Sequence, residues 1–180
     1  MVFALLEIVD MIAMTLIVGY IFLDIFARYT QSWKEAFILS MWAVAPGIIL
    51  HELGHKFVGM AFGYVATFNA AYLWLGIGLL LKMMSGFAFF VPAYVSISCA
   101  DTCLVHPLVN ALIAFSGPAI NAILWAGSWY ALKHYTFKPQ TRIIVGATMQ
   151  INKLLFFFNM LPIPMFDGFA VYSGLFNAIF

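Results

Sequence analysis

The chain has 180 residues, of which 65% are hydrophobic and only 8% are charged, and its mean hydropathy is +1.02. A soluble domain carries about 25% charged residues, so this composition excludes a chain that covers itself with a polar surface. It predicts one integral-membrane domain over residues 1–180, with an all-α polytopic fold in the lipid bilayer of the cell membrane. The net charge of +1 and the absence of a basic run argue against a nucleic-acid partner.

The first apolar stretch, residues 3–27, is long enough to cross a bilayer, since about 20 apolar residues span the hydrocarbon core. It contains three acids, Glu7, Asp10 and Asp24, which share one stripe on a helix with about 3.6 residues per turn. We interpret this stripe as facing the rest of the bundle or anchoring the helix at the interface. The alternative is that one of the three acids is a metal ligand or a gate.

The second apolar stretch, residues 37–64, contains the motif His-Glu-Leu-Gly-His over residues 51–55. Residues four apart lie above one another on a helix, so His51 and His55 can bind one metal ion together. Glu52 lies about 100° further round the helix and can reach a water molecule on that metal, as in the H-E-x-x-H pattern of zinc peptidases. Because these polar side chains are costly to bury in hydrocarbon, their position favours a functional site.

Residues 66–100 do not form a clear span. Two apolar arms, 71–81 and 86–98, are each shorter than the usual minimum of about 17 residues. We interpret them as a re-entrant hairpin or an irregular membrane-embedded segment, which is stable only when it packs against protein. A single long tilted span is the alternative.

Lys56, which precedes this region, is expected to extend its side chain towards one membrane face.

The loop that follows contains Cys99, Cys103 and His106. These three side chains could bind a metal, but no fourth ligand lies nearby in the sequence. Free thiols or a local disulfide are therefore the favoured interpretations.

The next span, residues 107–132, contains Ser-Gly-Pro-Ala-Ile-Asn over residues 116–121. Small residues with a proline allow a neighbouring helix to pack closely. Asn121, at the end of this motif, has two possible roles. It is either a hydrogen-bond partner between helices or a residue that holds the backbone of a bound peptide, and the sequence leaves both open.

Residues 143–161 are predicted to form the last full span. Pro162 and Pro164 follow, and two prolines so close together cannot both lie inside a regular helix. Asp167 is on this bent segment, between apolar residues, and therefore calls for a partner. The residues after it, up to Phe180, are too few to cross again and are expected to form a short helix at the interface.

A catalytic zinc ion usually has three protein ligands and a water molecule, so the two histidines need a third ligand. The soluble pattern with a third histidine would require glycine at position 58 and histidine at position 61, and the chain has neither. No glutamate follows Glu52, and the later acids are Asp101, in a loop, and Asp167. If residues 66–100 begin and end on one side of the membrane, Asp167 reaches the depth of the histidines, which favours it as the third ligand.

Together, the motifs H-E-L-G-H, S-G-P-A-I-N and N-M-L-P-I-P-M-F-D-G resemble those of the site-2 protease family of intramembrane zinc metalloproteases, over most of the chain beyond residue 37. The stretch F-A-F-F-V-P-A-Y-V-S-I is similar to that of short archaeal members, and no PDZ or CBS module is present. The resemblance implies a core of three transmembrane helices and one zinc ion. It also implies roles for six residues: His51, His55 and Asp167 as zinc ligands, Glu52 as the catalytic base, and Asn121 and Asn159 near the substrate.

The function implied by this resemblance is cleavage of peptide bonds within or near transmembrane segments of membrane proteins, as in regulated intramembrane proteolysis. Such substrates are expected to unwind locally, because the carbonyl groups of a helix are already hydrogen-bonded. Two alternatives remain open. One is a catalytically silent, membrane-embedded metal-binding scaffold, and the other is a metal or proton transporter, suggested by the acids of the first span.

The membrane orientation also remains open. The loops 28–36 and 133–142 contain five of the eight basic residues, and the positive-inside rule would place them in the cytoplasm. The resemblance implies instead that the active site, at the other end of the motif span, opens to the cytoplasm.

Overall fold

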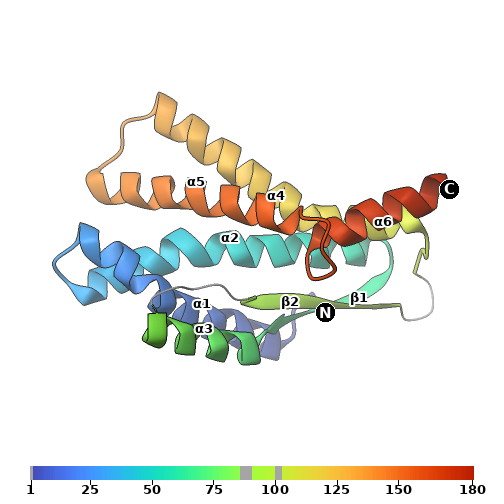
Figure 1. Ribbon diagram of the computed structural model, residues 1–180, viewed down its shortest axis with the longest axis horizontal. Coiled ribbons are helices and arrows are strands. Elements are labelled where there is room, and N and C mark those ends of the chain that lie inside the picture. Colours follow the sequence, from blue (N-terminus) through green and yellow to red (C-terminus); the bar gives the residue numbers. More distant parts are fainter. Residues whose placement is uncertain (1, 86–90, 100–102) are drawn as a thin grey trace.

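The computed structural model describes residues 2–85, 91–99 and 103–180 (Figure 1). It has the predicted fold class, an all-α polytopic membrane protein, with a two-stranded sheet in addition. The elements are, in order, α1 (Leu5–Phe26), the 3-10 turn η1 (Ala27–Tyr29), α2 (Trp33–Ala61), β1 (Tyr64–Ala70), α3 (Tyr72–Ser85), β2 (Ala93–Cys99), α4 (Pro107–His134), α5 (Pro139–Asn159) and α6 (Asp167–Ile179).

Three helices of the described chain are long and apolar enough to cross a membrane, namely α1 continued through η1, α2 and α4. The span predicted over residues 143–161 stays a prediction. The helix α5 covers most of it, but α5 is not among the three, because Gln150, Asn152 and Lys153 interrupt its apolar sequence. The C-terminal residues form the expected short helix, α6.

The motif helix α2 lies in the middle of the molecule, with α4 and α5 on one side and α1, α3 and the sheet on the other (Figure 1). Its apolar side chains Val44 and Ile48 belong to a buried core that also contains Met14 and Val18 of α1 and Phe68 of β1. In Figure 1, α2 and α5 run in the same direction, and α4, which lies between them in the sequence, runs in the opposite direction. The ends of α2 and α5 and the start of α4 are therefore at one end of the molecule, and the two basic loops are at the other.

The segment between α2 and α4 returns to the level at which it starts. Strands β1 and β2 are antiparallel, and Tyr64, the first residue of β1, pairs with Cys99, the last residue of β2. This geometry agrees with the predicted returning segment and not with a single long span. The first predicted arm is the helix α3, whereas the second arm is the strand β2, preceded by residues 86–90, which lie outside the described part of the chain.

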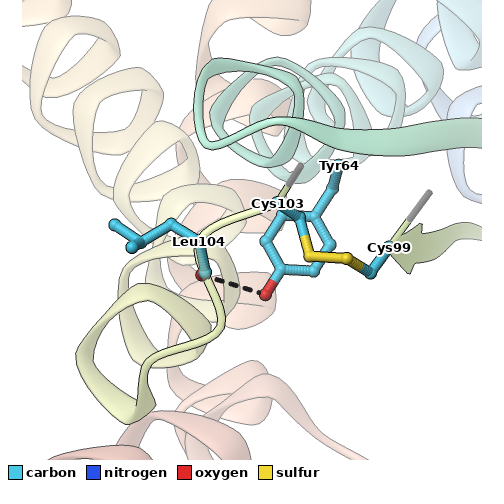
Figure 2. Close-up of a disulfide and its surroundings, with 4 residues drawn as sticks. All are labelled: Tyr64, Cys99, Cys103 and Leu104. Atoms are coloured by element: carbon cyan, nitrogen blue, oxygen red, sulfur yellow. Dashed lines mark hydrogen bonds between the residues drawn. A yellow bond between two sulfur atoms is a disulfide. The ribbon is translucent and has the colours of Figure 1, made fainter. Parts of the chain in front are cut away.

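A disulfide joins Cys99 to Cys103, one of the two interpretations favoured for these residues (Figure 2). Because both sulfur atoms form this bond, the pair is not a metal site. The hydroxyl group of Tyr64 donates a hydrogen bond to the carbonyl oxygen of Leu104 over 3.2 Å (Figure 2). The Leu104 amide in turn donates to the carbonyl oxygen of Phe62 over 3.1 Å. These bonds attach the start of the α4 connection to the end of α2.

The expectation for Lys56 is wrong, because its side chain points into the protein and is only 2% exposed. Its ammonium group donates to Glu7 Oε1 over 2.6 Å and to the carbonyl oxygen of Ala66 over 2.7 Å. The same Glu7 oxygen accepts the amide of Phe68 over 2.7 Å. A buried charge is stable only when it is paired and hydrogen-bonded, and this pair provides both while joining α1, α2 and β1.

Two acids of α1, Glu7 and Asp10, face the rest of the protein, as the first interpretation predicts, whereas the side chain of Asp24 is largely exposed. Asp10 accepts hydrogen bonds from the amide of Ala70 over 3.0 Å and from the hydroxyl group of Tyr72 over 2.6 Å. Asp24 pairs with Lys82 over 3.5 Å. The alternative in which one of these acids is a metal ligand has no support in the described part of the chain, where the metal-ligand cluster contains none of them.

The buried pair of Glu7 and Lys56 predicts a large effect on stability. Glu7→Gln should lower the free energy of unfolding by about 3–5 kcal/mol, because it leaves the Lys56 ammonium buried without a carboxylate. Thermal unfolding in detergent micelles measures this change. Asp24→Asn is the matched control and should cost less than about 1 kcal/mol, because surface pairs contribute little and the Asp24 side chain is 73% exposed. Equal stability of the two variants would contradict the prediction.

Candidate metal centre

Three ligand atoms come together where the first residue of α6 meets the second half of α2. His51 and His55 lie one turn apart on α2, and Asp167 is the first residue of α6. Asp167 Oδ2 is 3.1 Å from His51 Nε2 and 3.4 Å from His55 Nε2. The two Nε2 atoms are 3.1 Å apart. Within the described ranges this is the one cluster of three metal-ligating side chains, and Asp101, the other late acid, lies outside those ranges.

The turn between α5 and α6 delivers Asp167 to the histidines. The helix α5 ends at Asn159, before Pro162 and Pro164, which cannot continue it. The chain folds back tightly, since a Cβ atom at Gly168 would lie 2.5 Å from the carbonyl carbon of Met160. Glycine at this position therefore lets the first turn of α6 pack directly on the backbone that precedes it.

Hydrogen bonds on the outer sides of the rings orient both histidines. His55 Nδ1 is 2.8 Å from the carbonyl oxygen of Ile113, which can only accept, so Nδ1 carries the proton. His51 Nδ1 is 2.6 Å from Asn121 Oδ1 and donates to it in the same way. In both neutral rings Nε2 is then unprotonated and points towards Asp167. This is the arrangement in which histidine binds a metal.

The residues fit a zinc ion. Tetrahedral zinc with bonds of about 2.0–2.1 Å places its ligand atoms about 3.3 Å apart, close to the three distances of this cluster. Two unprotonated nitrogens and a carboxylate oxygen repel one another at such distances unless a cation lies between them. Asp167 Oδ2 is buried and faces the two unprotonated nitrogens. A bound cation would satisfy it.

Gly117 of α4 lies directly against the two histidine rings. A Cβ atom at this position would lie 2.4 Å from His55 Nε2 and 2.7 Å from His51 Nε2. Any side chain here would therefore occupy the space in front of the ligand atoms. The sequence indicated only that the small residues around Gly117 allow close packing. The contact of Gly117 with the two histidines depends on how α4 packs against α2.

Asn121 lies behind His51 and is fully buried. Its amide nitrogen donates to the carbonyl oxygen of Gly47 over 3.2 Å and to Asn152 Oδ1 over 2.9 Å. With the bond to His51, its side chain joins α4 to α2 and α5. Of the two roles open for Asn121, this position corresponds to the partner between helices, because the residue is not among those that line the neighbouring cavity.

Asn152 is a buried residue of the candidate site that sequence reasoning missed. It is fully buried, and it donates from Nδ2 to the carbonyl oxygen of Thr148 over 2.8 Å while its Oδ1 accepts from Asn121. Because Asn152 accepts from the nitrogen of the Asn121 amide, the oxygen of that amide points towards His51. The available signal was an asparagine within an otherwise apolar part of α5.

A cavity of about 790 Å³ opens in front of the metal ligands. His51, Glu52 and His55 line one wall, and β2 contributes another wall with Val95. Glu52 is 8% exposed. Asn159 lines the same cavity, so the second asparagine expected near the substrate faces it. The volume is in the range of about 300–1,000 Å³ that is typical of ligand sites.

The hydrogen bond between Asn121 and His51 predicts an effect on metal affinity. Asn121→Ala should weaken zinc binding about 10–100-fold, because partners of ligating histidines contribute that much to affinity. Competition with a chromogenic chelator measures the change. Asn159→Ala removes the same amide from the cavity wall and should leave zinc affinity unaltered. A loss of affinity in Asn159→Ala and not in Asn121→Ala would reverse the assignment.

A substitution at Gly117 is expected to have a stronger effect on zinc binding. Gly117→Ala should abolish stoichiometric zinc binding, since the added methyl group overlaps the ligand atoms, and metal analysis of the purified protein measures this. Gly127→Ala in the same helix is the control, because a Cβ atom there meets nothing within 4 Å. Normal zinc content in Gly117→Ala would mean that the ion is not held where the three side chains converge.

Two relatives resemble the chain over most of its length. "Putative zinc metalloprotease MJ0611" of Methanocaldococcus jannaschii is 37% identical over 166 residues, which are 90% of this chain and 81% of the relative. "Putative zinc metalloprotease YwhC" of Bacillus subtilis is 25% identical over 168 residues, 85% of this chain and 74% of the relative. No protein-family model matches the chain, and no solved structure matches it. The ligand geometry agrees with the names of these relatives, and at this identity and coverage the chain belongs to their family, the zinc metalloproteases.

Proposed function

We propose that the protein is an intramembrane zinc metalloprotease of the site-2 type, which cleaves peptide bonds within or near transmembrane segments of other membrane proteins. The observation that carries this proposal is the position of the metal centre on α2, one of the three helices long and apolar enough to cross a membrane. His51 precedes the end of α2 at Ala61 by ten residues, or roughly 15 Å. The peptide bond that reaches it would therefore lie below the membrane surface.

His51, His55 and Asp167 would hold the zinc ion, which supplies the Lewis acid that polarises a peptide carbonyl and acidifies a water molecule. Glu52, beside the ligands on α2, takes the proton of the attacking water as the oxygen adds to the carbonyl carbon. It then delivers that proton to the nitrogen of the leaving amine, so that the C–N bond breaks without forming an amide anion. The carboxylate begins and ends the reaction unprotonated.

The cavity suits an extended peptide in an apolar environment. Its walls are mostly apolar, and Asn159 offers an amide that can pair with a backbone unwound from its helix. Unwinding is required because helical carbonyl groups are otherwise engaged. The substrate in this proposal is a transmembrane protein, and the protease itself is a multi-pass protein of the cell membrane.

Two other functions have less support. A catalytically silent metal-binding scaffold would not require the Glu52 carboxylate, which lines the cavity beside the ligands. A metal or proton transporter was suggested by the acids of α1, and these make hydrogen bonds or ion pairs with Lys56, Tyr72 and Lys82 instead.

The test is the substitution Glu52→Gln. It should reduce cleavage of transmembrane reporter proteins in liposomes about 10²–10⁴-fold, which is the usual contribution of a general base, and it should leave zinc content unchanged. Removal of zinc with a chelator should stop the wild-type reaction, and added zinc should restore it. A wild-type protein that binds zinc yet cleaves no reporter would instead support the scaffold.

A further inference from the structure

A second cavity, of about 860 Å³, lies between α1 and α5 on the side of the molecule that carries the basic loops. On α1 it is lined from Phe22 to Tyr29, and on α5 from Pro139 to Leu154. We call it the α1–α5 groove. It runs along the two helices, and its lining is mostly apolar.

The groove adjoins the cavity in front of the metal ligands, because Phe22 of α1 and Ile151 and Leu154 of α5 line both of them. A molecule lying in the groove is therefore next to the catalytic cavity, along the surface of α5.

The floor of the groove contains a glycine that the protein itself does not require. A Cβ atom at Gly146 would meet nothing within 4 Å, although glycine inside a helix costs about 1 kcal/mol relative to alanine. Ala147 follows it in the same lining. Small residues on a membrane helix let the backbone of another helix approach closely, so this surface is shaped for a helix.

A cation lies towards the end of the groove away from the metal centre. Arg142, in the first turn of α5, lines the groove. No ion pair joins its guanidinium group to an acid within the ranges 2–85, 91–99 and 103–180. An acidic side chain on the occupant would complement it, and a bidentate carboxylate suits the planar guanidinium group.

We infer that the α1–α5 groove binds the transmembrane helix of the substrate, with an acidic residue of that helix at Arg142 and its unwound end in the catalytic cavity. This inference rests on the proposed function and adds a requirement for the substrate. From Arg142 to Asn159 the helix α5 advances 17 residues, or roughly 26 Å. A substrate helix alongside it therefore has its cleaved bond about 15–17 residues from the acidic residue.

The first experiment detects binding without catalysis. A photoreactive benzoylphenylalanine replaces Tyr29, which lines the groove, or Tyr130 of α4, which does not, in the Glu52→Gln protein in liposomes. Both tyrosines are more than half exposed, so the larger ring fits at either position. The probe is a single-span alanine–leucine helix with one aspartate near its end and a glycine–proline pair about 16 residues away. Position 29 should cross-link to the probe at least ten times more than position 130. Equal cross-linking at both positions, or cross-linking to lipid alone at 29, would overturn the inference.

The second experiment measures cleavage of the same probe. Gly146→Leu fills the groove and should reduce cleavage at least tenfold, whereas Gly127→Leu, also in open space, should cleave at the wild-type rate. Arg142→Glu should reduce cleavage of the aspartate probe and restore it for a probe with arginine in place of the aspartate. Thermal unfolding checks that every variant is folded.

The two experiments separate the two proposals. If the wild-type protein cleaves no probe or reporter, the proposed function fails, and the cross-linking ratio still decides whether the groove binds a helix. If the wild-type protein cleaves the probe and Gly146→Leu cleaves it equally well, the groove inference fails while the protease assignment stands.

Discussion

Three electron-pair donors meet within 3.4 Å of one another beside the second half of α2, and this juxtaposition is the constraint on which the rest of the structure depends. Without a cation it is unfavourable, because the two Nε2 atoms and the carboxylate repel one another. The parallel course of α2 and α5, the proline-broken turn and the bare backbone of Gly117 all serve to bring these atoms together. The free energy of folding of the surrounding helices thereby maintains an arrangement that metal binding would stabilise.

Two layers of polar contacts support the motif helix on its different sides. Asn121 and Asn152 form a chain of amides behind His51, so that the orientation of a ligand is fixed by residues of α4 and α5. Lys56 and Glu7 form a buried pair that attaches β1 and the start of α1 to α2. The first layer orients a candidate metal ligand, and the second holds in place the sheet whose strand β2 lines the cavity beside it.

The cavities give the proposed reaction a spatial order. The α1–α5 groove is apolar and offers a glycine surface for a helix, whereas the cavity beside the metal ligands has polar groups for an extended backbone. A substrate helix can retain its own hydrogen bonds in the first and lose them only in the second, where Asn159 lies. Separating these two environments confines the cost of unwinding to a few residues next to the ligands.

The sequence by itself determined what depends on local geometry and composition. Helical periodicity placed His51 and His55 on one face with Glu52 beside them, and low charge indicated the membrane. The shortage of later acids, together with its expected depth, made Asp167 the candidate for the third ligand. Contacts between distant segments were decided only by the tertiary structure. Glu7 finds Lys56 across 49 positions, Asn121 turns towards His51 in place of the cavity, and β1 pairs with β2 around α3. The period of a helix is set by its own backbone, whereas the partner of a buried polar group is set by which surfaces the whole chain brings together.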